Sequence, residues 1–249
     1  MLYKYVGNED PKKVVDYLQR FVNNGTIKAT APQEFNDPAE LKANFSFEAT
    51  KSEIRARINL IWPHINEEGV NFWIDNNDKI AKSNDALNLR HSLIQTSGVI
   101  CLTLDPDNYL MWSHYAHSHS GFCIGFSDQV LNQFISKDIV AHAFVRYEER
   151  PPSVNFYTAS IEDVSRAVFM HKSKVWEYEK EFRLIFRSAG IKKISTSSIK
   201  EIVLGCRASE ELKAYARTLI GSSIRVFKMR ESVSSYKLEK IELSENVDI

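Results

Sequence analysis

The sequence predicts an α+β fold, with a single mixed or antiparallel sheet as its core, flanking helices and a helical insertion. The composition is ordinary for a globular protein, with 43% hydrophobic and 26% charged residues, which excludes a disordered chain. Short apolar runs typical of strands dominate from residue 98 onward. Residues 48–95 instead show helical character. Neither repeats nor long linkers interrupt the sequence, so we expect one domain over residues 1–249 with an insertion at about 48–95.

The N-terminal elements follow from local signals. Asp10 before Pro11 is typical of a helix N-terminus, and Asn24-Gly25 is typical of a helix end. We therefore expect a strand over 3–6, a helix from Pro11 to Val22, a strand over 26–30, and helices within 48–95 that are interrupted near Pro63 and Gly69.

The C-terminal elements are mostly strands. Apolar runs between turn residues such as Asp105-Pro106 indicate them. We expect strands over 99–104, 121–126, 140–147, 182–186, 199–204, 224–229 and 236–243, helices over 160–174 and 209–220, and a frayed end over 246–249.

Cysteine usage and hydropathy bear on the cellular setting. The three cysteines are odd in number, and their spacing matches no zinc motif. The N-terminus has no apolar signal segment, and no apolar run approaches the roughly 18 residues of a membrane span. We expect a cytoplasmic protein that does not enter a membrane.

Positive charge is concentrated late in the chain. Residues 166–230 hold 15 Lys/Arg and 6 Asp/Glu, whereas residues 1–165 hold 15 and 21. A basic face attracts phosphates, which makes nucleic acid a candidate partner. A solvated basic surface facing an acidic half of the same protein is the alternative, because the net charge of the whole chain is zero.

Three segments carry candidate site residues. Asn36-Asp37-Pro38 is typical of a turn, which either caps a helix or presents Asn36 or Asp37 to a ligand. The run 110–119 holds three histidines, and either packs into the core or forms a pocket in which Trp112 or Tyr115 stacks on a planar group and His114 donates a hydrogen bond. A metal shared by His114 and His117 would need further ligands.

The third segment, residues 172–186, places three carboxylates among bulky residues before an apolar strand. In an extended chain Glu177, Glu179 and Glu181 share one face, and their repulsion calls for nearby cations. Lys172, Lys174 and Arg183 can supply them. We expect either a salt-bridged edge strand or a carboxylate pair that binds a substrate hydroxyl and activates a nucleophile.

By contrast, the segment Gly121–Phe126 is typical of a buried strand, in which Cys123 is a small apolar residue.

Taken together, these segments resemble a bacterial family of unknown function. The resemblance spans roughly residues 2–230. It rests on Lys4-Tyr5, Asn36-Asp37-Pro38, Met111 to Ala116, Gly121 to Phe126, Trp176, Tyr178, Glu179, Glu181 and Arg183.

Glu179-Lys180-Glu181, entering a strand, is also similar to the Glu-x-Glu element of ADP-ribosyltransferases. This similarity implies an enzyme that consumes NAD, in which Glu181 stabilises the cationic ribose and Glu179 assists the acceptor. It further implies that His114 or Tyr115 holds the ribose or stacks on nicotinamide. The residues expected to bind NAD are Tyr3, Tyr5, Asn36, Asp37, Trp112, Tyr115, Tyr178 and Arg183.

The expected biological setting is a bacterial toxin or phage-defence effector that modifies nucleic acid or protein, with an antitoxin or a neighbouring defence protein as partner. Two alternatives stay open. One is a metal-dependent nuclease or hydrolase that uses Asp37, Glu179, Glu181 and a lysine. The other is a non-enzymatic sensor whose aromatic clusters bind a ligand.

Overall fold

The computed structural model of the 249-residue chain describes residues 1–82, 94–95, 97–135 and 139–244. The expected fraying over 246–249 and a part of the expected insertion, residues 83–93, lie outside these described residues. Within them, no helix has both the length and the apolar character that crossing a bilayer requires.

The core is one eight-stranded mixed sheet, which confirms the predicted fold class. All neighbouring strands are antiparallel except for β12 and β13. Their spatial order is β14 (Leu238–Glu242), β13 (Arg225–Glu231), β12 (Ile199–Leu204), β5 (Phe122–Phe126), β1 (Leu2–Val6), β4 (Gly98–Thr103), β10 (Glu181–Phe186) and β6 (Ile139–Phe144).

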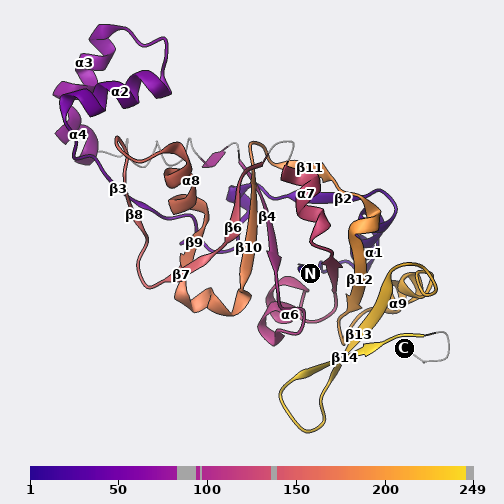
Figure 1. The fold of residues 1–249 in the computed structure, drawn as a ribbon. Helices are drawn as coiled ribbons and strands as arrows, with labels where there is room; N and C mark the ends of the chain where they lie inside the picture. Colours follow the sequence, from indigo (N-terminus) through magenta and orange to yellow (C-terminus); the bar gives the residue numbers. More distant parts are fainter. Residues whose placement is uncertain (83–93, 96, 136–138, 245–249) are drawn as a thin grey trace.

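Three short strand pairs and a set of helices surround this sheet (Figure 1). The pairs are β2 (Thr26–Ala29) with β11 (Gly190–Lys193), β3 (Asn44–Ser46) with β8 (Ser153–Asn155), and β7 (Arg146–Glu148) with β9 (His171–Ser173). The helices are α1 (Pro11–Val22), α2 (Lys51–Ile61), α3 (Glu67–Asp75), α4 (Asn77–Lys82), α6 (Tyr109–Tyr115), α7 (Gln129–Ile135), α8 (Ile161–Phe169) and α9 (Glu210–Arg217).

Side chains alternate between the two faces of the sheet, and each face has its own core. On the first face, Ile100, Leu184 and Ile202 pack with Leu18 of α1 and Leu212 of α9. Both helices begin at a side-chain cap, from Asp10 and Ser209 respectively, so local chemistry places their starts.

The second face carries two smaller apolar clusters with a polar region between them. One cluster joins Tyr5 and Phe227 to Trp112 of α6, and the other joins Val99 and Ile185 to the segment that ends α8. Because these clusters cover different strands, the part of β4 and β10 between them is left for polar side chains.

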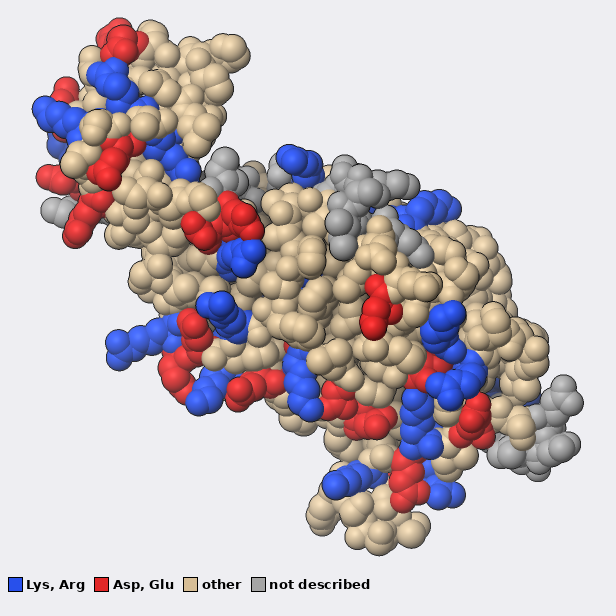
Figure 2. Space-filling model, viewed as in Figure 1, with Lys and Arg blue, Asp and Glu red and all other residues tan. Residues whose placement is uncertain are grey.

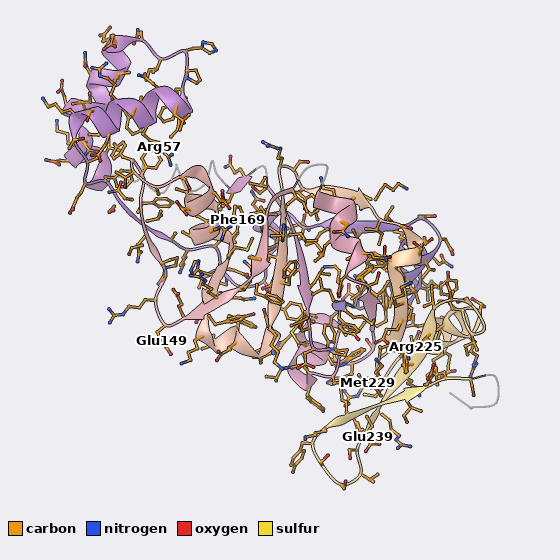
Figure 3. All side chains as sticks on the ribbon, viewed as in Figure 1. Arg57, Glu149, Phe169, Arg225, Met229 and Glu239 are labelled. Atoms are coloured by element: carbon orange, nitrogen blue, oxygen red, sulfur yellow. The ribbon has the colours of Figure 1, made fainter. Side chains whose placement is uncertain are left out.

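The predicted insertion forms a separate helical layer in its described part. Helices α2 and α3 pack around Ile58 and Val70, and Thr50 and Glu53 form a capping box at the start of α2. Figure 1 shows α2, α3 and α4 projecting from the body at the end opposite to the β13–β14 hairpin. In Figure 3, Arg57 of α2 and Glu239 of β14 mark these two ends.

Several expectations about local structure are wrong. Gly69 lies inside α3 and does not interrupt a helix, and the strand expected over 140–147 is divided into β6 and β7, which belong to different sheets. Helix α8 ends at Phe169 and not near residue 174, because residues His171–Ser173 pair with β7 as strand β9. Residues Lys174–Glu179 form a 3-10 helix and not an extended chain. Pairing with a distant strand outweighs local helical preference at the end of α8.

Candidate functional site

The turn between the 3-10 helix and β10 brings two carboxylates to the same place. Lys180 adopts a left-handed conformation with φ of 46°, and its ammonium group bonds Asp105 at 2.9 Å. This reversal lets Glu179, at the end of the 3-10 helix, and Glu181, at the start of β10, both face the second side of the sheet. Glu177 is exposed and does not join them.

A cavity of about 320 Å³ lies beside these carboxylates. Its size is within the lower part of the range usual for small-molecule sites. Segments far apart in the sequence form its walls. Among the predicted site residues, those that line it are Tyr3, Tyr5, Asn36, His114, Tyr115, Glu179, Glu181 and Arg183.

One side of the cavity is a buried ionic cluster, formed by Glu40, Lys172, Glu179, Glu181 and Arg183. The Lys172 Nζ atom lies 2.6 Å from Glu179, 3.6 Å from Glu40 and 3.8 Å from Glu181. All five side chains are at most 5% exposed. Three carboxylates therefore surround two cations, which removes most of the repulsion that the sequence predicted for the acidic run.

Arg183 is the most enclosed member of this ionic cluster. Its Nε and Nη2 atoms each donate to a different oxygen of Glu181 at 2.8 Å, and Nη1 donates to the carbonyl of Phe169 at 2.9 Å. The guanidinium also contacts Glu40 and lies 5.7 Å from the centre of the Phe35 ring. Such two-pronged bonding fixes the orientation of the Glu181 carboxylate.

Tyr115 connects the ionic cluster to the mouth of the cavity. Its hydroxyl donates to Glu179 Oε1 at 2.6 Å, while Lys172 holds Oε2. The same hydroxyl interacts with the side chain of Asn36, which is exposed. A continuous polar chain thus runs from the Asn-Asp-Pro turn through Tyr115 to the buried carboxylates.

Burial and charge shift the protonation of these groups. Burial raises the pKa of Glu181 to about 7, although Lys172 favours its charged form. Burial alone would lower the pKa of Lys172, but Glu181 and Glu179 raise it above its ordinary value, so this lysine stays charged. Burial raises the pKa of Tyr115, which keeps its hydroxyl a donor.

Several residues that line the cavity were not predicted from the sequence, among them Glu40, Lys4 and Cys101. Glu40 closes the ionic cluster from the loop after the Asn-Asp-Pro turn, and no pattern marked it. Lys4 interrupts the apolar strand β1, and this was the available signal; burial lowers its pKa. Cys101 donates a hydrogen bond to Glu181, and burial raises the pKa of its thiol well above the ordinary value, so it is a thiol and not a thiolate.

Three predicted site residues do not line the cavity. Trp112 is completely buried in the core, and its indole nitrogen donates to the carbonyl of Pro106 at 2.9 Å. Asp37 accepts a hydrogen bond from the backbone of Ala39, which is a turn role. Tyr178 packs beside the cluster around Trp112.

Of the predicted cations and histidines, some lie at the cavity and others lie away from it. Lys172 and Arg183 neutralise the carboxylates as expected, whereas Lys174 lies 3.8 Å from Glu149 on the surface. His114 lines the cavity at the end of α6, and His117 lies beyond that helix in a left-handed turn. Among the described residues, no group of three or more His, Cys, Asp or Glu side chains is placed to hold a metal ion.

Comparison with known proteins links part of this site to a family. No curated protein and no solved structure matches the chain. The matched segment, residues 111–184, runs from α6 to β10 and holds His114, Tyr115 and the Glu179–Glu181 turn, but not β1 or the Asn-Asp-Pro turn. Over these residues the chain matches the model of the family described as "Protein of unknown function (DUF2971)".

Proposed function

We propose that the protein is an NAD-consuming enzyme of the ADP-ribosyltransferase type and that its reaction takes place in the cavity beside Glu179 and Glu181. The observation that carries the proposal is the convergence of Tyr3, Asn36 and Tyr115 with these two carboxylates around one cavity. Residues 36, 115 and 179 are also joined by one polar chain.

The chemistry needs negative charge close to a sugar. When the bond between ribose C1′ and the nicotinamide nitrogen breaks, its electron pair leaves with nicotinamide and positive charge develops on the ribose. The Glu181 carboxylate is held by Arg183 before any substrate arrives, so it can stabilise this charge without reorganising. An acceptor hydroxyl then bonds to C1′, and its proton passes to Glu179.

The remaining walls suit the neutral parts of such a substrate. Tyr5, Phe35 and Met111 offer apolar and aromatic surface for a planar ring, and the exposed His114 and Asn36 offer hydrogen bonds at the mouth. In this scheme, Tyr115 holds Glu179 in place and acts as a positioning residue.

The test is release of nicotinamide from NAD by the purified protein, with water, proteins and nucleic acids offered as acceptors. We expect Glu181→Gln and Glu179→Gln to lower the rate on the order of 100-fold, as for loss of a preorganised charge. Glu67→Gln is the control, because Glu67 is an exposed carboxylate paired with Arg55 in the helical insertion and does not line the cavity.

The proposal fails if the wild-type protein neither binds nor cleaves NAD with any acceptor. It also fails if Glu67→Gln loses as much activity as the two cavity variants, since the effect would then not be specific to the cavity.

The non-enzymatic sensor is the second candidate, favoured by the observation that every oxygen of Glu179 and Glu181 already has a partner. A sensor that binds NAD predicts saturable binding without nicotinamide release, and binding weakened by Asn36→Ala. The nuclease alternative gains no such support, because Asp37 does not line the cavity and cations occupy both glutamates.

A further inference from the structure

A second cavity lies at the other end of the sheet and shares no lining residue with the first. It has a volume of about 680 Å³. Its lining residues are Cys206, Arg207, Lys228, Met229, Arg230, Glu231, Ile241 and Leu243. We call it the β12–β13 groove.

The topology gives this groove a special place. Strands β12 and β13 are the parallel pair of the main sheet, and α9 connects them. Cys206 and Arg207 directly follow β12, and residues 228–231 form the C-terminal half of β13. The groove therefore lies at the carboxyl ends of these two parallel strands.

The groove is basic. Three of its eight lining residues are cations, namely Arg207, Lys228 and Arg230, and one is an acid, Glu231. Lys228 and Arg230 are two residues apart on β13, so they point to the same face. Figure 2 shows Lys and Arg side chains, with acids between them, over the region where Figure 1 places β13. Figure 3 labels Met229, the residue between these two cations.

Lys228 differs from the other two cations of the groove. Within the described residues it forms no ion pair, whereas Arg207 lies 4.0 Å from Glu231 and Arg230 lies 2.8 Å from Glu239. Lys213, itself paired with Glu210 at 2.7 Å, lies near Lys228. Burial and the positive charge of Lys213 lower the pKa of Lys228. An anion bound beside Lys228 favours its charged form.

We propose that the β12–β13 groove binds a phosphate-bearing ligand through Lys228, Arg207 and Arg230. Arginine bonds phosphate oxygens in pairs, and lysine adds a point charge. A phosphate here takes the place of Glu231 as the partner of Arg207, because their separation of 4.0 Å is the longest of the groove's ion pairs. Ile241, which lies opposite Lys228 in the pairing of β13 with β14, offers apolar surface to the uncharged part of the ligand. The site does not depend on the reaction proposed for the first cavity.

The experiment measures binding of two probes to the whole protein at low ionic strength. The probes are inorganic pyrophosphate, followed by calorimetry, and a short fluorescent single-stranded oligonucleotide, followed by anisotropy. We expect both Lys228→Gln and Arg207→Gln to weaken binding about tenfold, as for loss of a charged hydrogen bond. Lys228→Arg keeps the charge and should keep most of the affinity.

Lys200→Gln is the matched control, because Lys200 is an exposed cation near the start of β12, at the end of the strand remote from the groove. It should change the affinity less than twofold. If Lys228→Gln does not fold, Arg207→Gln and Lys228→Arg carry the test, since Arg207 is 63% exposed.

The two probes distinguish the source of the phosphate. Equal affinity for pyrophosphate and oligonucleotide identifies a small phosphorylated molecule, and much tighter binding of the oligonucleotide identifies a nucleic acid backbone. The proposal is overturned if neither probe binds, or if Lys200→Gln weakens binding as much as the groove variants do, because attraction to overall charge would then explain the result.

Discussion

The Tyr115 hydroxyl donates a hydrogen bond of 2.6 Å to the Glu179 carboxylate, although 64 residues separate the two in the chain. This bond joins helix α6 to the turn before β10. It also connects the open mouth of the cavity with the buried ionic cluster. Substitutions at the two residues should therefore be energetically coupled.

Tyr115→Phe should show this connection in the stability of the protein. The change leaves one buried oxygen of Glu179 without a donor, which costs about 1–3 kcal/mol of unfolding free energy. Urea unfolding of Tyr115→Phe, Glu179→Gln and the double variant forms a thermodynamic cycle. A coupling energy of zero would show that the hydrogen bond contributes nothing to folding.

Arg183→Met should destabilise the protein far more than loss of a surface cation. The change leaves Glu40 and Glu181 buried with Lys172 as the one remaining cation of the ionic cluster, and breaking a buried ion pair on one side costs about 3–5 kcal/mol. Arg166→Met is the control, because Arg166 forms an exposed pair with Glu162 worth about 0.5 kcal/mol. Equal losses in urea unfolding would contradict the importance of the ionic cluster.

Trp112→Phe separates a core role from a binding role. The indole is fully buried, and its loss leaves a void and an unpaired carbonyl at Pro106, which together cost about 2–4 kcal/mol. Binding of a cavity ligand, measured by calorimetry below the melting temperature, should change little. A large loss of affinity with unchanged stability would show instead that Trp112 takes part in ligand binding.

His119 should make stability depend on pH below neutrality. Burial and the nearby Arg207 lower its pKa, while in the unfolded chain the value lies at about 6.5. As pH falls through 6.5, the unfolded chain takes up a proton that the folded protein binds less readily, so stability is lost. His119→Asn suits the left-handed backbone there, with φ of 70°.

The measurement is the free energy of unfolding between pH 7.5 and about 5 for the wild type and His119→Asn. The variant should lose less stability over this range, whatever its stability at pH 7.5. Parallel curves would mean that His119 titrates alike in both states.

Much of the fold was predictable because its signals are local. The Asp10-Pro11 start of α1, the Asn24-Gly25 turn and the apolar run of β5 are each specified by neighbouring residues, and each lies where the sequence places it. The errors fall where distant partners decide. Residues His171–Ser173 become a strand only because β7 lies beside them.

Some features of the candidate site were likewise predictable from local signals, and others were not. The like charges at residues 177–181 predict cations nearby, and Lys172 and Arg183 take this role. Trp112 looked like a ligand-stacking residue because a sequence cannot distinguish a buried aromatic ring from one that lines a pocket. Glu40 carries no signal at all, since its partners are more than 100 residues away.

The amino-acid order by itself determined the fold class, the starts of several helices and the presence of an acidic turn with its own cations, because propensity, capping and charge repulsion act over a few residues. Only the tertiary structure decided that β1, the Asn-Asp-Pro turn, α6 and the start of β10 meet at one cavity. Burial on the sheet then converts Glu40, Lys172 and Arg183 from separate charges into one network, since ionic contacts of this kind depend on distances that the chain sets only after it has folded.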